Sequence, residues 1–128
     1  NNFNFTWGRL FFIYGNDQNI STFYGELINA IANNKNQFNM SSGKQKLDYL
    51  RIDKAAELIA ELACKNKNLG AVNVCSGKPI SIIDFAKNIV KSYSSNIKLN
   101  TGFYSNRNYE SNNFWGDNTY LNTILQKN

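Results

Sequence analysis

The stretch Gly8-Arg9-Leu10-Phe11-Phe12-Ile13-Tyr14-Gly15 decides how this sequence is interpreted. A nearly continuous apolar run leads into a Tyr-Gly turn, which is typical of a strand buried on both faces of a parallel sheet. We therefore expect one strand over residues 3–13. Its end would lie at the carboxyl edge of the sheet, where α/β proteins bind ligands. On composition alone, the same stretch is more typical of an ordinary core strand that ends in a glycine turn.

The remaining apolar pattern alternates between short strands and helices. Helical spacing predicts helices over 21–32, 53–65 and 81–93, and a short terminal helix from residue 117 or 118. Short strands are expected over 38–40, 46–51, 71–75 and 97–99. Ser21, Asp53 and Ser81 are the expected N-caps of the three longer helices. This alternation favours the α/β class, with three to four helices.

Length and composition predict one folded domain over residues 1–128. The chain is 42% hydrophobic and 18% charged, which is sufficient for a packed core. Its net charge is +5, but the lysines are scattered along the sequence, which favours a solvated surface over a nucleic-acid-binding stripe.

Histidine is absent, which excludes zinc sites with mixed His/Cys ligands and Ser-His-Asp catalysis within this chain. Cys64 and Cys75 fit no metal or redox spacing, and both lie in apolar runs, so we expect no metal site and two buried, reduced thiols. No apolar run reaches membrane-spanning length and no signal peptide is visible. We therefore expect a cytoplasmic protein that does not bind membranes.

Three later segments carry most of the functional signal. One runs from Asp48-Tyr49 through Asp53-Lys54-Ala55-Ala56, and one covers 72–86 with Ser76-Gly77 before Ser81. The last consists of Arg107 followed by Phe114-Trp115-Gly116-Asp117. Each segment alone is compatible with a purely structural role. Together with residues 8–15, their order and intervals from Trp7 to Leu121 resemble the extended short-chain dehydrogenase/reductases, the nucleotide-sugar epimerase/dehydratase family.

The resemblance is to the C-terminal, substrate-binding half of that Rossmann-type fold. It implies that Arg107 binds the diphosphate of a nucleotide-sugar, with the ligand lying against Tyr14 and the loop from Asn16 to Ser21. The family carries an arginine at the position of Leu47. The neighbouring Lys46 is the nearest cation and is included among the candidate substrate contacts.

A second departure is Phe12, where many relatives carry a ligand-contacting asparagine. A phenyl ring cannot donate the corresponding hydrogen bonds, which indicates a branch with altered substrate contacts or a member that no longer turns over.

The catalytic features of the family are not found in this sequence. A Gly-rich cofactor turn of the form G-x-x-G-x-x-G and a Tyr-x-x-x-Lys pair are both absent. We expect no catalytic residue and no cofactor site in this chain, while the parent family uses NAD(P).

Three functional hypotheses follow. The first is the substrate-binding fragment of a nucleotide-sugar epimerase, dehydratase or reductase, whose N-terminal Rossmann half is missing. The second is a stand-alone, non-catalytic binding or interaction domain derived from that family. The third, less favoured, is a nucleic-acid-binding module that stacks bases on aromatic side chains. An isolated fragment would also expose strand edges and apolar faces, so we expect it to dimerise or aggregate.

Overall fold

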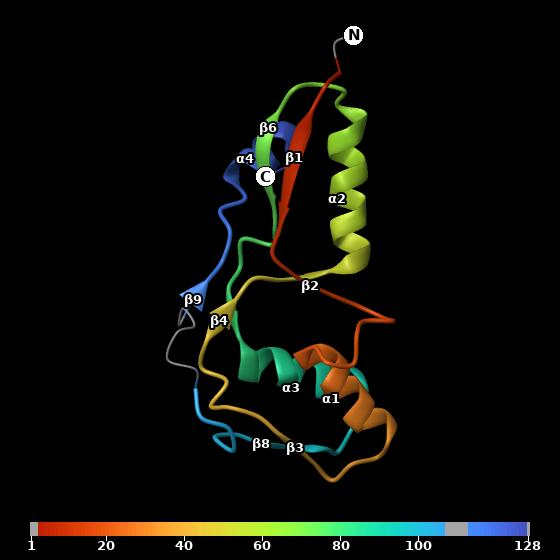
Figure 1. Cartoon of the computed structure of the whole chain (residues 1–128), viewed down its shortest axis with the longest axis vertical. Helices are drawn as coiled ribbons and strands as arrows, with labels where there is room; N and C mark the ends of the chain where they lie inside the picture. The colour runs from red at the N-terminus through yellow and green to blue at the C-terminus, as the bar shows by residue number, and fades with distance from the viewer. Residues whose placement is uncertain (1–2, 107–112, 128) are drawn as a thin grey trace. The chain divides into compact units, whose positions relative to one another are not determined.

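The computed structural model describes residues 3–106 and 113–127, and these form two compact units (Figure 1). Of the described residues, unit 1 comprises 3–15, 48–79 and 114–127, and unit 2 comprises 16–47, 80–106 and 113. Each unit is therefore assembled from segments that are far apart in sequence. The single domain expected over residues 1–128 stays a prediction.

Unit 1 contains two parallel strand pairs. The first joins β1 (Thr6–Leu10) to β6 (Gly70–Val74), and the second joins β2 (Phe12–Tyr14) to β5 (Tyr49–Arg51). The expected single strand over 3–13 is therefore wrong, because the chain changes its pairing partner at Phe11. Burial on both faces was expected for the apolar run from Leu10 to Ile13, and it is wrong there, since Leu10 is 54% exposed and Phe12 is 39% exposed.

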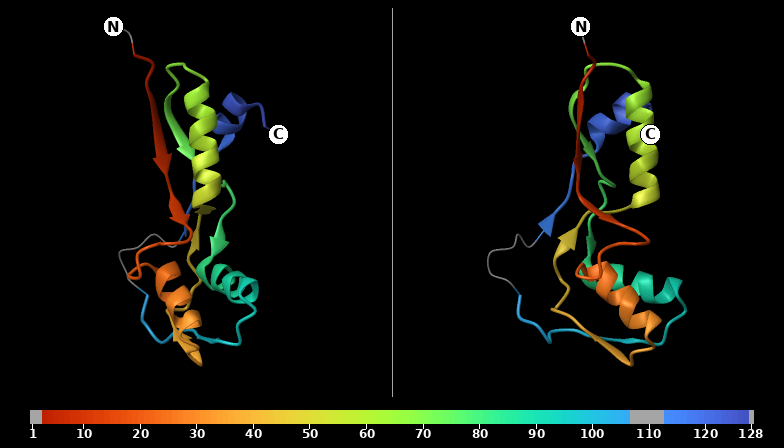
Figure 2. Two further views of the ribbon diagram at one scale, coloured as in Figure 1. Left: turned by 90° about the vertical axis from the view of Figure 1, so that its right-hand side faces the viewer. Right: turned by 45° about the vertical axis from the view of Figure 1, so that its right-hand side comes forward.

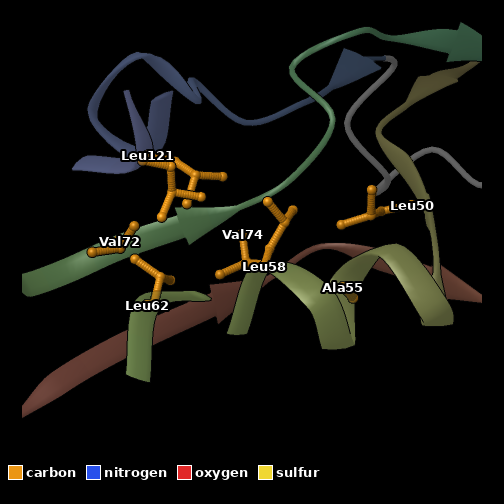
Figure 3. Close-up of a cluster of buried hydrophobic side chains, with 8 residues drawn as sticks. Leu50, Ala55, Leu58, Leu62, Val72, Val74 and Leu121 are labelled. Carbon is orange, nitrogen blue, oxygen red and sulfur yellow. The ribbon is translucent and has the colours of Figure 1, made fainter. Parts of the chain in front are cut away.

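The hydrophobic core of unit 1 lies between its strands and two helices (Figure 3). Helix α2 (Ile52–Cys64) contributes Leu58 and Leu62, which face Val72 and Val74 of β6, and α4 (Thr119–Leu125) adds Leu121. Burying each of these side chains contributes about 1.5–3 kcal/mol. The views in Figure 2 show α2 running alongside the β1–β6 pair.

The start of α2 differs from the expectation. Arg51 is its N-cap, without a side-chain cap bond, and Asp53 is the second helical residue. The prediction that Asp53 caps the helix is therefore wrong. The Asp53 carboxylate still lies in the first turn, where its negative charge interacts favourably with the helix dipole. It also accepts a hydrogen bond from Arg51 Nε at 3.0 Å.

A buried carboxylate, Asp48, ties three parts of unit 1 together. Its side chain is fully buried and accepts backbone hydrogen bonds from Ser76 at 2.8 Å, Gly77 at 2.9 Å and Gly116 at 3.2 Å. A carboxylate can enter a core only when its oxygens are satisfied in this way. Asp48 also interrupts the strand expected over 46–51, which forms two short strands on either side of it.

Unit 2 combines two helices with short strands, and α1 lies beside α3 in Figures 1 and 2. Its elements are α1 (Phe23–Ala32), β3 (Gln37–Asn39), β4 (Lys46–Leu47), β7 (Ile80–Ser81), α3 (Ile82–Ser92) and β8 (Lys98–Asn100). Strand β3 pairs with β8 in parallel, and β4 pairs with β7 in antiparallel orientation. Strand β9 (Asn113–Phe114), at the boundary between the units, lies beside β4.

Hydroxyl side chains cap both helices of unit 2, as expected, but the cap of α1 is one residue later than predicted. The Ser81 hydroxyl caps α3 by accepting from the Asp84 backbone at 3.2 Å, and it donates to the Asp84 carboxylate at 2.6 Å. At α1 the cap is Thr22, which accepts from Gly25 at 3.1 Å. The prediction that Ser21 caps α1 is therefore wrong by one residue, because Ser21 bonds the Asn19 side chain instead.

The two cysteines have different environments. Cys75 is buried, and burial is the largest cause that raises the pKa of its thiol, to about 11. Cys64 is exposed at the end of α2, so the prediction of two buried thiols is wrong for this residue. Among the residues that the structure describes, no helix is long and apolar enough to cross a membrane.

The Asp48 interactions predict that unit 1 depends on this one side chain. We expect Asp48→Ala to lower the free energy of unfolding by about 3 kcal/mol or more, because the buried N–H of Gly116 and the partly buried N–H groups of Ser76 and Gly77 lose a charged acceptor. Chemical denaturation followed by circular dichroism measures this change. The matched control is Asp17→Asn, an exposed aspartate with φ of 61°, where asparagine fits. Equal stability of the two variants would contradict the expectation.

The unpaired edge of β1 and its exposed apolar side chains predict that the chain associates with itself. In the described part of the chain β1 has β6 as its only strand neighbour, and Trp7 and Leu10 are more than half exposed. We expect light scattering to show dimers or larger species whose mass rises with concentration, and Trp7→Lys with Leu10→Lys to reduce it. A monodisperse monomer at high concentration would contradict this prediction.

Candidate functional site

A cavity lies in unit 2, past the carboxyl ends of the parallel strands β3 and β8. Its volume is about 830 Å³. It is lined by residues of α1, of the chain that follows β3, and of the segment that follows β8; these are Phe23, Glu26, Phe38, Asn39, Met40, Ser41, Ser42, Gly43, Lys44, Gln45, Ile82, Tyr104, Ser105, Asn106 and Asn113. This is the edge of a parallel strand pair at which α/β folds place ligands.

The floor of the cavity is fixed by backbone hydrogen bonds. Met40 N–H donates to the Asn100 carbonyl at 3.0 Å, and the Met40 carbonyl accepts from Phe103 N–H at 3.0 Å. The Asn100 amide also donates to Asn39 Oδ1 at 2.9 Å. The two chain segments that leave the parallel strands are therefore held side by side where the cavity begins.

The turn Ser41-Ser42-Gly43-Lys44 forms one wall. Gly43 has a positive φ of 66°, and a Cβ there would lie 2.8 Å from Met40 Cε and 2.9 Å from Ile83, so only glycine fits. Its carbonyl accepts from Ile83 N–H at 3.0 Å, which joins the turn to the start of α3. The Ser42 hydroxyl donates to Asn106 Oδ1 at 3.1 Å, which joins the turn to the segment that follows β8.

The chemistry of the cavity is polar with aromatic surfaces. Side-chain amides and hydroxyls dominate, and the charged members are Lys44 and Glu26, both exposed. Tyr104 is 57% exposed and is packed edge-on against Phe103 at 4.9 Å between ring centroids. Such a set can stack a planar ring, hydrogen-bond its edges and attract an anion.

The five residues predicted as substrate contacts fall in different places. Tyr14 is the last residue of β2 in unit 1, whereas Asn16, Ser21 and Lys46 belong to unit 2. Arg107 lies outside the described residues. The prediction that these residues share one cleft with a bound substrate stays a prediction.

The local environments of these residues are defined. Burial is the largest cause that raises the pKa of Tyr14, and the Arg51 guanidinium opposes it. Asn16 is exposed in the turn after β2, and the Ser21 hydroxyl lies 2.9 Å from Asn19 Oδ1. The exposed Lys46 donates its backbone N–H to Asn113 Oδ1 at 3.1 Å, and Asn113 lines the cavity.

The sequence prediction missed most residues that line the cavity. Ser41 to Lys44 was predicted only as a turn, although a turn directly after a short strand is the position at which a parallel pair presents a ligand site. The pairing of β3 with β8 joins segments about sixty residues apart, and no short-range pattern indicates it.

An NAD(P) site requires glycines that leave room for a pyrophosphate at a helix start. Here the glycines near helix starts are closely packed by protein. A Cβ on Gly15 would meet Ile52, one on Gly25 would meet the Asn19 backbone, and one on Gly77 would meet Asn118. The described residues do not fit a dinucleotide, so no hydride step is derived from them. They also contain no group of three or more potential metal ligands.

No protein-family model matches the chain. A curated relative from Aggregatibacter actinomycetemcomitans, dTDP-6-deoxy-L-talose 4-dehydrogenase (NAD(+)), is 27% identical over 113 residues, which is 88% of this chain and 42% of the relative.

Solved structures agree on the fold. A UDP-N-acetylglucosamine 4-epimerase from Methanobrevibacter ruminantium M1, in complex with UDP-N-acetylmuramic acid, matches 94% of this chain and 39% of its own, with a TM-score of 0.79 and 22% identity. A putative epimerase from Burkholderia cenocepacia J2315 matches 95% of this chain and 40% of its own, with a TM-score of 0.82 and 15% identity.

The comparisons confirm two predictions: the α/β fold of the C-terminal part of the extended short-chain dehydrogenase/reductases, and the resemblance to that family. The chain spans about two fifths of the length of these relatives.

Proposed function

We propose that this relative of the nucleotide-sugar epimerases and dehydratases is the substrate-binding part of an NAD(P)-dependent epimerase, dehydratase or reductase that acts in the cytoplasm. The observation that carries the proposal is the polar, aromatic-lined cavity past the carboxyl ends of β3 and β8. Solved neighbours were obtained with UDP-N-acetylmuramic acid and with UDP-glucuronic acid and NAD, which supports a ligand of this class.

The cavity has the groups that a nucleotide requires. Tyr104 and Phe23 offer ring faces against which a base can stack. Asn39 and Asn106 offer amides for the base and ribose, and Lys44 offers a cation for a phosphate. Arg107, by its resemblance to the family's diphosphate-binding arginine, is a second phosphate contact.

We assign the hydride-transfer step to a Rossmann part that is not among these 128 residues. The 128 residues lack the Gly-rich turn and the Tyr-x-x-x-Lys pair, and their glycines do not form a cofactor cradle. We therefore propose that this chain binds and orients the sugar nucleotide, while a Rossmann part that these residues do not contain holds the nicotinamide. When bound there, that cofactor supplies hydride transfer to or from the sugar.

Calorimetric titration with UDP- and dTDP-sugars tests the proposal. We expect a subset to bind, and we expect Lys44→Ala and Arg107→Ala each to weaken binding about tenfold or more, because each removes a charge-assisted phosphate contact. The matched controls are Lys67→Ala and Arg9→Ala, which remove the same charges from exposed positions of unit 1 and should leave affinity unchanged.

Three other outcomes would contradict the proposal. The first is no binding by any sugar nucleotide, and the second is equal loss in the control variants. The third is tight, steeply salt-dependent binding of arbitrary oligonucleotides, which would favour the nucleic-acid hypothesis.

With NAD(P) and a bound sugar nucleotide present, the chain alone should give no change in nicotinamide absorbance.

A further inference from the structure

A second cavity of unit 2 lies at the amino ends of β3 and β8, at the other end of this strand pair from the proposed nucleotide cavity. Its volume is about 650 Å³, which is the size of a small-molecule site. It is lined by the turn that joins α1 to β3 and by the turn that joins α3 to β8. Figure 1 shows the two parallel strands side by side, so the turns that lead into them are neighbours.

The turn after α1 is fixed by its own backbone. Asn34 has a positive φ of 52°, and its N–H donates to the Ile31 carbonyl at 3.0 Å. The next residue, Lys35, donates its N–H to the Ala30 carbonyl at 3.0 Å. This pair of bonds is the Schellman arrangement, which satisfies carbonyls at the end of a helix.

The turn after α3 repeats the same arrangement. Ser94 has a φ of 49° and donates its N–H to the Lys91 carbonyl at 3.0 Å, and Ser95 donates its N–H to the Val90 carbonyl at 3.1 Å. The Ser95 hydroxyl also accepts from Ile97 N–H at 3.2 Å. The cavity is therefore formed by two helix-end turns of one design, each fixed before any ligand binds.

The side chains of the cavity supply hydrogen-bond donors and positive charge. Its charged members are Lys35 and Lys98, and both are exposed. In the described part of the chain neither lysine forms an ion pair, and the lining contains no acidic residue. The lining also includes the side-chain amides of Asn34, Asn36 and Asn96.

The charge at this cavity is positive although two helices end beside it. Each helix end carries about half a negative charge, so the two ammonium groups leave about one positive charge in excess. The helix-end carbonyls already accept hydrogen bonds within their turns, so mainly side-chain donors remain for a ligand. The cavity therefore favours an anion over a cation.

Apolar side chains show that the ligand is larger than a simple ion. Tyr93 lines the cavity with a ring that is 47% exposed, and the half-buried Ile31 lines it as well. An inorganic anion would leave these side chains and most of the volume uncovered, whereas an aromatic group can pack against them. A phosphate monoester carries about 1.5 to 2 negative charges at pH 7, which matches two lysines.

We propose that the cavity at the amino ends of β3 and β8 binds aryl phosphate monoesters. Lys35 and Lys98 contact the phosphate, and Tyr93 packs against the aromatic ring. This assignment goes beyond the proposed function, because the site needs neither a sugar nucleotide nor NAD(P). The same chemical group occurs in free aryl phosphates and in phosphotyrosine.

An NMR titration of the 128-residue chain tests the site. Phenyl phosphate is added while the backbone amide signals are followed. We expect the signals of Lys35, Ser94, Ser95 and Lys98 to shift along one binding curve with an affinity on the order of 1 mM, because exposed charges each contribute little. Inorganic phosphate should bind at least about threefold more weakly, because it leaves Tyr93 uncovered. Phenol, which has the ring without the charge, should leave these signals unmoved.

A second arm of the titration distinguishes the two sources of the ligand. A pentapeptide with a central phosphotyrosine is compared with phenyl phosphate. Tighter binding of the peptide would support the site and assign it to a phosphorylated protein segment. Equal or weaker binding of the peptide would support the site and assign it to a free aryl phosphate.

Charge-removing variants and a matched control complete the test. Lys35→Ala and Lys98→Ala should each weaken phenyl phosphate binding about threefold, and the double variant about tenfold. The control is Lys67→Ala in unit 1. Lys67, like Lys35, directly follows a left-handed asparagine at a helix end, here Asn66 with φ of 47°, but it does not line the cavity. It should leave binding unchanged.

Four results would each overturn the proposal. They are unmoved signals with phenyl phosphate, equal affinity for phenyl phosphate and inorganic phosphate, the same loss of affinity in Lys67→Ala, and shifts at Ser42 and Lys44 in place of Ser94 and Ser95. The last result would assign the phosphate to the nucleotide cavity. Binding of sugar nucleotides without binding of phenyl phosphate would overturn this site and leave the proposed function intact.

Discussion

The buried carboxylate of Asp48 is the constraint on which the rest of unit 1 depends. Its oxygens accept three backbone N–H bonds, two from the turn at Ser76-Gly77 and one from Gly116. The backbone carbonyl of Asp48 accepts from Phe12 N–H at 3.2 Å as well. One residue therefore joins the start of β2, the turn after β6 and the segment before α4. Without it the N–H of Gly116 would be buried without an acceptor, which costs more than an ordinary hydrogen bond contributes, and the partly buried N–H groups of Ser76 and Gly77 would lose theirs as well.

This constraint also explains how unit 1 presents its surfaces. Because Asp48 points inward, the chain begins a new strand at Tyr49, and β5 then pairs with β2 in a register that aligns Phe12 with Tyr49. Gly116 is held so close to Cys75 and Phe11 that no larger residue fits there. Two residues earlier, Phe114 stacks on Phe11 and meets Phe12 edge-on.

Local patterns predicted the elements of the fold more accurately than their boundaries. Helices α1, α2 and α3 follow from apolar spacing and nearby caps, and the end of α3 at Ser92 agrees within one residue. The breaks at Phe11 and Asp48 could not be predicted, because each arises from a long-range partner: a change of strand pairing in one case and three distant amides in the other. The exposure of Leu10 had the same origin, since an apolar strand sequence does not reveal which of its sides a partner covers.

The sequence predicted the kind of site better than its residues. A ligand at the carboxyl edge of parallel strands was expected after Tyr14, whereas the described cavity follows β3 and β8. Lys44 and Tyr104 were not expected there, because only tertiary pairing brings their segments together. Asn16 and Ser21 were derived from the family resemblance, and no described contact tests their role.

Amide hydrogen exchange measures the central interaction directly. We expect the amides of Ser76, Gly77 and Gly116 to exchange as slowly as those of β6. We expect Asp48→Asn to accelerate all three together, while α3 in unit 2 keeps its protection. Exchange of these three amides at the rates of exposed loops in the wild-type chain, or their independent response to the substitution, would contradict it.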